Sequence, residues 1–396
     1  MDLNLKKYRV YLPLFIIYIA FGFRIFTNFA FRFIGITPQQ VQYLDSLIQV
    51  VWCIKVVFGA VINSFDQNYK VVMIISSGIG LIGYLLCSFN NSVIFQITGL
   101  ILVNVSMVLS DIVVDACMVI LNQDTEIDPS EVQPYGWVAL YFGIFLGHFV
   151  GGFVHDSPYF YYIWMLAPII SLLCAFYLPK SENKKQIFTF GNCRLLFNKR
   201  TLILCLFIVI SRSAPTYSVG LDLFRKTVGI SIASISWSKA VGAILAMFTS
   251  FLFKVTLANI HVTLQLVVIQ AVLVGLCFLD SLSIQIHQLS LLVGIDCLDQ
   301  IYNGIYVLIV IIYAMSICPK GFEAIYLSII MTTYNVGTAL SEVFGGITFH
   351  FLDIDHSYDS LKYAILIKII WSVASCITLM LFERRQQLED IEAKNE

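Results

Sequence analysis

Apolar runs bounded by polar residues, glycine or proline divide the chain into two successive sets of six. The first set lies near residues 11–34, 40–63, 70–89, 93–120, 134–154 and 159–179. After a polar stretch from Lys180 to Arg200, the second set lies near residues 201–220, 232–253, 260–280, 289–315, 324–350 and 360–382. A helix needs roughly 20 apolar residues to cross a bilayer. The pattern therefore predicts an all-α polytopic membrane protein with twelve transmembrane helices in two six-helix halves.

These runs set the expected domain boundaries. We expect an N-terminal half over residues 1–179, a cytoplasmic linker over 180–200, a C-terminal half over 201–383 and a cytoplasmic tail over 384–396. The basic residues before the first run resemble the start of a signal sequence. However, Arg24 and Arg32 stand where small residues would mark a cleavage site, so we expect a retained first helix.

The composition predicts that lipid is the solvent of this chain. Hydrophobic residues make up 59% of it and charged residues only 12%, with a mean hydropathy of +0.84; soluble domains carry about 25% charged residues. Twelve helices leave no room for a separate soluble enzyme domain. A net charge of −1 without basic blocks argues against nucleic acid as a partner. The ten cysteines form no C-x-x-C pair, so we expect no metal and no cofactor.

Lysine and arginine are distributed unequally between the two sides of the predicted bundle. The termini and the even-numbered connections hold fifteen of them, and the opposite loops and their edges hold four: Arg32, Arg225, Lys226 and Lys362. Because cytoplasmic segments are enriched in these residues, we expect both termini in the cytoplasm. We expect the plasma membrane, with an organelle membrane as the alternative.

Small residues repeat at helical spacing in both halves. Their positions on the eleventh span follow those on the fifth by a constant 194 residues: Gly143, Gly147, Gly151 and Gly152 match Gly337, Ser341, Gly345 and Gly346. Such stripes let neighbouring helices approach closely, so the simplest role for them is packing. Their recurrence six helices later indicates a duplicated architecture. Two six-helix halves related by an axis along the membrane normal describe the major facilitator arrangement, in which the site lies between the halves.

Ionisable residues inside the spans are the candidates for function, since each costs roughly 2.5–3.5 kcal/mol at mid-bilayer. The basic ones are Arg24, Lys55, Arg212, Lys239 and Lys368, and the acidic ones are Asp45, Asp111, Asp115, Asp296, Asp299 and Glu342. We expect the substrate-binding residues among them to be Arg24, Lys55, Asp111, Asp115, Arg212 and Lys239. No nucleophile, base and orienting group occur together, so no catalytic site and no enzyme are expected.

Asp111 and Asp115 are four residues apart and share one helical face. Two carboxylates this close raise each other's proton affinity, so one of them could carry a coupling proton. Alternatively, each is held by a cation such as Lys55 or Arg24 and never exchanges its proton. The spacing leaves both alternatives open.

Several stretches together resemble the folate-biopterin transporter family of major facilitator proteins. They are Trp52–Lys55 with Gly59, Ser110–Ala116, and Trp137 with the glycine stripe to Gly152. The most specific stretch is Cys318–Ala324, followed by Ser328, Asn335, Gly337, Ser341, Gly345 and Gly346. The chain departs from the family at Val56, where a proline is usual, and at Ile120, where a carboxylate is usual.

The resemblance implies a secondary transporter of folates or unconjugated pterins. A carboxylate such as Asp115 or Asp111 can accept the paired N–H groups of a pterin, and basic residues would suit a glutamate tail. Next to the cytoplasmic loop, Gly321 and Glu323 are expected to stabilise the inward gate. Protons and lipid are the other expected partners, and no obligate protein partner is inferred. The alternatives are a carrier of another metabolite, such as S-adenosylmethionine or an amino acid, and a receptor of the same fold that does not transport.

Overall fold

The computed structural model describes residues 10–395, apart from residues 34, 36, 65–67, 90–91, 126–128, 156, 158, 179–198, 257–261, 287–288 and 318–322. Its regular elements are helices throughout the described ranges. The basic N-terminal residues, Gly321 and residues 180–198 of the predicted linker lie outside these ranges, and the last two linker residues begin helix α11 (Lys199–Arg212).

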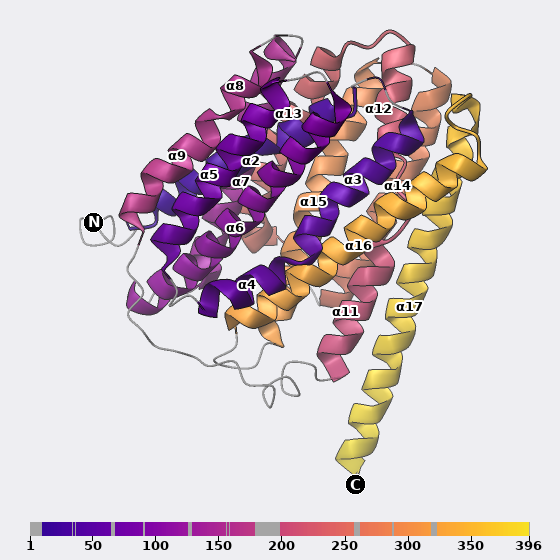
Figure 1. Cartoon of the computed structure of the whole chain (residues 1–396). Helices are drawn as coiled ribbons and strands as arrows, with labels where there is room; N and C mark the ends of the chain where they lie inside the picture. Colours follow the sequence, from indigo (N-terminus) through magenta and orange to yellow (C-terminus); the bar gives the residue numbers. More distant parts are fainter. Residues whose placement is uncertain are drawn as a thin grey trace.

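Six helical segments make up the N-terminal half (Figure 1). They are α2 (Leu12–Phe31), α3 with α4 (Pro38–Cys53 and Lys55–Ser64), α5 (Tyr69–Phe89), α6 (Val93–Thr125), α7 (Pro129–Val154), and the run of α8, α9 and η1 (Phe160–Trp164, Leu166–Cys174 and Ala175–Tyr177). The second segment breaks at Ile54, whose N–H bonds to Trp52 O instead of continuing the helical ladder. A capping box between Thr37 and Gln40 starts α3.

The C-terminal half repeats this plan. Its helices are α11 with α12 (Lys199–Arg212 and Ser218–Thr227), α13 (Ile232–Thr256), α14 (Val262–Ile286), α15 (Leu289–Ser316), α16 (Glu323–Phe351), η3 (Tyr358–Ser360) and α17 (Leu361–Asn395). Pro215 lies in the break between α11 and α12, where its missing N–H ends helical pairing. The last helix continues to Asn395, so the expected boundary between the twelfth span and a tail at residue 383 is not a helix end.

The helix contacts of one half recur in the other. In the N-terminal half α2 packs on α7, α5 on α6 and α9, and α3 on α6; in the C-terminal half α11 packs on α16, α14 on α15 and α17, and α13 on α15. The two halves meet along two helix pairs, α7 with α13 and α3 with α16. This arrangement is the predicted two-half, major facilitator-like bundle.

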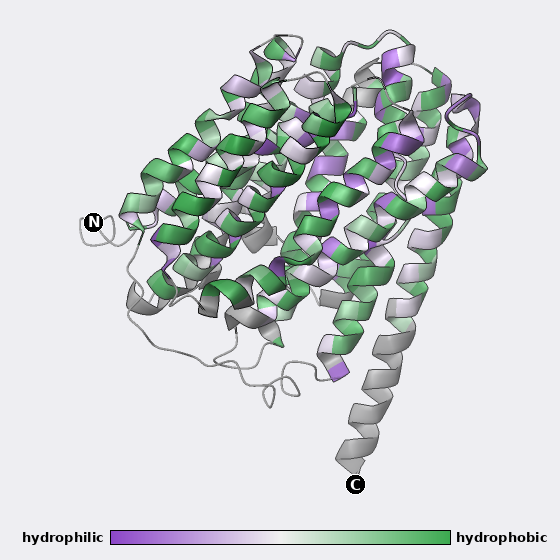
Figure 2. Cartoon of the chain, in the orientation of Figure 1, coloured by the Kyte–Doolittle hydropathy of each residue, from purple (hydrophilic) through white to green (hydrophobic). Residues whose placement is uncertain are grey.

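Ten helical segments of the described chain are long and apolar enough to cross a membrane. The expected spans near 201–220 and 324–350 do not meet this measure, because the first is broken into α11 and α12 and the second carries polar residues along α16. The count of twelve therefore stays a prediction. Much of the helical ribbon carries the colour of hydrophobic residues (Figure 2), and Phe89, Ile94 and Phe153 are 65–79% exposed. These side chains suit a lipid environment.

Close approach of α2 and α7 depends on two glycines. A Cβ atom on Gly143 would lie 2.1 Å from Ile19 O, and one on Gly22 would lie 2.1 Å from Leu140 O. Any larger residue at either position forces the two backbones apart. The stripe expected from the sequence is therefore a contact surface with α2 from Gly143 to Gly151, and Gly152 at its end faces Trp237 of the other half.

We predict that Gly143→Leu lowers the unfolding temperature of the purified protein, because overpacking a filled contact costs typically 1–3 kcal/mol. Gly78→Leu on α5 is the matched control, since no atom lies within 4 Å of a Cβ atom at Gly78. Equal thermal stability of the two variants would contradict the assigned α2–α7 contact.

Candidate functional site

Lys55, Asp111 and Asp115 form an ionic group in the N-terminal half, named here the Lys55 trio. Lys55 Nζ lies 2.6 Å from Asp111 Oδ2 and 2.8 Å from Asp115 Oδ2. Tyr18 donates a hydrogen bond of 3.1 Å to the other oxygen of Asp115. The Lys55 side chain is 4% exposed, whereas that of Asp115 is 47% exposed. The trio therefore has a buried cation and an accessible carboxylate.

The break between α3 and α4 positions this group. Lys55 is the first residue of α4, directly after the interruption at Ile54. The two aspartates project from one face of α6, as their four-residue spacing requires. Two carboxylates share one ammonium, so the fully ionised trio carries a net charge of −1. A proton or a cationic group of a solute would neutralise it.

Arg24 lies apart from the trio, inside the N-terminal half. It is fully buried and donates hydrogen bonds of 3.0 Å to both Ser106 on α6 and Ser171 on α9. Its guanidinium thus ties α2 to two neighbouring helices. In this conformation Arg24 is not exposed to a solute, although the sequence made it a binding candidate.

In the C-terminal half, Arg212 is enclosed by aromatic rings. Its guanidinium carbon lies 4.5 Å from the ring centre of Tyr334 and 5.5 Å from that of Tyr306. Its Nη1 donates to Asn303 Oδ1 at 3.3 Å, and its buried Nε has no hydrogen-bond partner. Among the described residues no carboxylate forms an ion pair with it. This Arg212 group can accept an anion or stack on a flat ring.

The Lys55 trio and the Arg212 group lie on helices that touch. Asn335, next to Tyr334 on α16, donates to Trp52 O on α3 at 3.4 Å. Trp52 lies three residues before Lys55 in the sequence. The contact between the halves thus brings an acidic group and a basic, aromatic group to neighbouring parts of the bundle.

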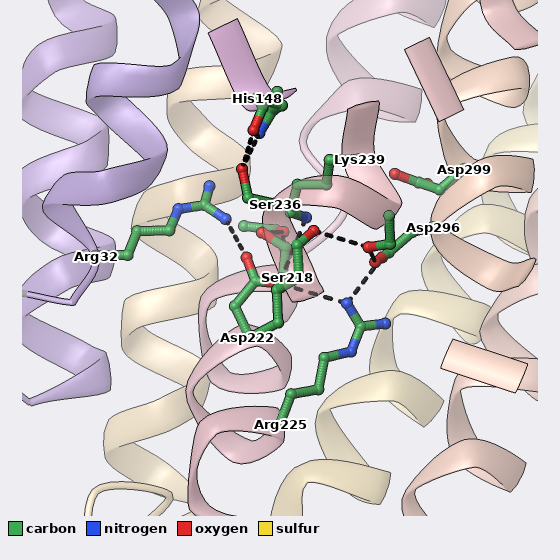
Figure 3. Close-up of polar contacts among 12 residues, drawn as sticks. Arg32, His148, Ser218, Asp222, Arg225, Ser236, Lys239, Asp296 and Asp299 are labelled. Atoms are coloured by element: carbon green, nitrogen blue, oxygen red, sulfur yellow. Dashed lines mark hydrogen bonds and ion pairs between the residues drawn. The ribbon is translucent and has the colours of Figure 1, made fainter. Parts of the chain in front are cut away.

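A second set of charges connects the two halves and is named here the Arg32 network. Arg32 lies 3.1 Å from Asp45 in its own half and 2.8 Å from Asp222 in the other half (Figure 3). Asp222 also pairs with Arg225 at 3.5 Å and with Lys239 at 3.4 Å. Arg225 in turn lies 2.8 Å from Asp296. The network lies at the end of the bundle where α2 ends and α3 begins, named here the Arg32 end.

Sequence reasoning missed two members of this network. Asp222 was not recognised as an internal acid, and Arg225 was assigned to a loop, yet the two are only 1% and 2% exposed. Both lie on α12, which extends the seventh segment beyond its expected end at residue 220. Their three-residue spacing on one helical face was the available signal. Lys239, expected to bind substrate, pairs with Asp222 and lies 5.3 Å above the ring of Phe29.

The remaining glycine candidates lie at helix contacts. A Cβ atom on Gly147 would meet Phe23 O, and one on Gly151 would meet the ring of Phe26. On α16, Gly337 faces Arg212 Cβ and Gly345 faces Thr216 O. Gly321 is outside the described ranges, and Glu323 begins α16. Within those ranges no group of three His, Cys, Asp or Glu residues could hold a metal ion.

Comparison with known proteins identifies a family and a fold. The model of the BT1 family matches residues 24–396. A search of curated proteins found no match. Among solved structures, the nucleoside transporter NupG is 12% identical with a TM-score of 0.72 over 96% of this chain and 98% of its own. A POT family transporter in complex with 5-aminolevulinic acid is 11% identical (TM-score 0.68; 93% and 94% covered), and the POT family transporter PepTSo is 10% identical (TM-score 0.72; 96% and 98% covered).

We predict that Lys55→Met destabilises the protein by about 3–5 kcal/mol, because it leaves two carboxylates in the bundle without their cation. Thermal unfolding of the purified protein measures the loss. Adding Asp111→Asn and Asp115→Asn to Lys55→Met removes the uncompensated charge and should restore most of the stability. Lys362→Met, at an exposed position on α17, is the control. Full stability of Lys55→Met alone would show that the trio does not hold α4 against α6.

Proposed function

This chain belongs to the BT1 family, and from that premise we propose that it is a secondary active transporter. Its proposed substrate is a folate or an unconjugated pterin, and it works by alternating access of the two halves with a proton as the coupling ion. The proposed membrane is the plasma membrane, with both termini in the cytoplasm and the Arg32 end outside. The Lys55 trio is the observation on which this proposal chiefly rests.

The trio supplies what a pterin requires of an acidic site. Asp115 is half exposed, and each of its oxygens retains a free lone pair after accepting from Lys55 or Tyr18. An amino group and a ring N–H side by side can therefore donate to it as a pair. Lys55 fixes the position of the carboxylate. The net negative charge of the trio would also allow it to bind a proton when no substrate is bound.

The Arg212 group supplies a complementary surface from the opposite half. A flat ring can stack on the half-buried Tyr334, and a carboxylate tail can accept from the guanidinium of Arg212, which is also half-buried. A solute held between the trio and Arg212 would contact both halves at once. Alternating access requires this arrangement, since the solute must stay bound while the halves rotate. We assign Arg24 and Lys239 to structural ion and hydrogen-bond networks and not to substrate.

The uptake of labelled folic acid and of biopterin into cells tests the substrate. We predict saturable uptake of at least one compound, reduced at least tenfold by Asp115→Asn or Arg212→Lys, since losing one charge-assisted contact costs about 1.4 kcal/mol or more. The Arg212→Lys variant keeps the charge but loses the planar donor group. Lys362→Ala at equal surface abundance is the control. Absence of uptake by a folded, surface-located protein would favour another metabolite, such as a nucleoside or an amino acid, or a receptor that does not transport.

Proton coupling has a separate test in proteoliposomes. We predict that an inward proton gradient accelerates uptake, and that Asp115→Asn removes this acceleration because a neutral amide cannot bind and release the proton. Counterflow without a gradient should persist in any variant that still binds substrate. Uptake that ignores the gradient in the unmodified protein would leave facilitated diffusion as the mechanism.

A further inference from the structure

Glu342 and Gln42 meet where α16 of one half crosses α3 of the other. Gln42 is fully buried, and its Nε2 donates to Glu342 Oε2. The side-chain oxygen of Gln42 is also buried and has no hydrogen-bond partner. The mechanism proposed above does not use either residue. A carboxyl group at a contact between halves is buried or exposed according to whether that contact is closed or open.

The carboxylate of Glu342 has no ionic partner in this conformation. The charged groups that face it are Asp45 on α3, Arg32 after the end of α2, and Lys368 on α17. Arg32 is occupied by Asp45 and Asp222, and Lys368 lies 4.9 Å above the ring of Tyr217. No cation of the described ranges comes within 4.0 Å of Glu342. Glu342 is half-buried in this conformation. Withdrawing a carboxylate from water without a cation is costly, so closing this contact favours the neutral acid.

Gln42 suits either form of Glu342. An amide carries a donor on one arm and an acceptor on the other, so Nε2 can donate to the carboxylate and the unpartnered oxygen can accept from the carboxylic acid. Opening the contact exposes Glu342 to water, where it ionises. Gln42 is neutral and does not balance the charge of a carboxylate, so the closed contact favours protonated Glu342 and the open contact favours ionised Glu342.

The internal repeat shows that the amide–carboxyl pair of Gln42 and Glu342 has no equivalent at the other of these two contacts between the halves. Shifting Gln42 and Glu342 by 194 residues along the chain leads to Ser236 and His148, which form the corresponding contact between α13 and α7. There Ser236 donates to the backbone oxygen of His148 at 2.6 Å and lies 3.5 Å from its ring Nδ1, so a histidine stands where the other contact has a carboxyl group. The same offset of 194 residues relates two ring contacts, that of Tyr43 with Gly346 and that of Trp237 with Gly152. The two contacts share their packing and differ in their polar pair.

We propose that Glu342 is a proton-binding site that controls the Arg32 end of the bundle: it is protonated when the α3–α16 contact is closed and ionised when the contact is open. This inference deepens the proposed function, since it rests on alternating access, and it names a second titratable group besides the Lys55 trio. Closing then takes up one proton. The ratio of closed to open molecules should therefore rise up to tenfold for each unit by which the pH falls through the titration range of Glu342.

Labelling of a buried cysteine measures the opening without any substrate. Ser46 is 6% exposed and its hydroxyl donates to Ala339 O across the same contact, so the thiol of Ser46→Cys reacts with a maleimide only when the contact opens. Phe351→Cys, at a position that is 80% exposed, corrects for the effect of pH on the thiol itself. Both variants are labelled in lipid nanodiscs, and peptide mass spectrometry reads each position separately from the native cysteines.

We expect the labelling rate of Ser46→Cys, relative to Phe351→Cys, to fall as the pH is lowered. With Glu342→Gln or Glu342→Met added, the relative rate should be low at every pH, because the neutral residue keeps the contact closed. Adding His148→Gln instead should leave the pH dependence in place, as should Asp359→Asn on the exposed η3. The proposal is overturned if the relative rate does not change with pH, if both Glu342 variants keep its pH dependence, or if His148→Gln removes it. A failure of folate or pterin uptake alters none of these outcomes, so the two proposals fail separately.

Discussion

A bilayer does not solvate an unpaired charge, and in this chain that constraint determines which helices lie next to one another. Lys55 joins α4 to α6 by binding two aspartates, and Arg24 joins α2 to α6 and α9 through serine hydroxyls. Arg32 joins the halves by pairing with an acid from each. Apart from the pair of Arg32 with Asp45, these contacts connect segments far apart in the sequence. The apolar surface drives the chain into lipid, but the polar groups select one arrangement of the helices.

Small residues let these polar contacts form at short range. Glycines on α7 bring its backbone against α2, and the last glycines of the α7 and α16 stripes, Gly152 and Gly346, receive aromatic rings from the opposite half. The contacts between the halves thus combine aromatic and apolar packing with a few polar pairs.

The sequence predicted the parts of the site that follow from helical periodicity. Two aspartates four residues apart must share a face, and a glycine stripe repeated after 194 residues must mark equivalent helices. Helical periodicity alone does not indicate which cation pairs with the two aspartates. That choice depends on the break at Ile54, which starts a new helix at Lys55, and nothing in the apolar run of the second span marks this position. Arg225 was misplaced for a similar reason, because the chain resumes a helix after Pro215 and carries the arginine back into the bundle.

The two ionic groups differ in what they must do when the bundle changes conformation. All three members of the Lys55 trio belong to one half, so the trio can move as a unit and keep its charge balance in every state. The Arg32 network takes Asp45 from one half and Asp222 from the other, so separating the halves at that end must break the pairing with one of them. A group that stays intact is suited to holding a solute throughout the cycle. A group that breaks is suited to distinguishing the states, and Glu342 lies beside that second group.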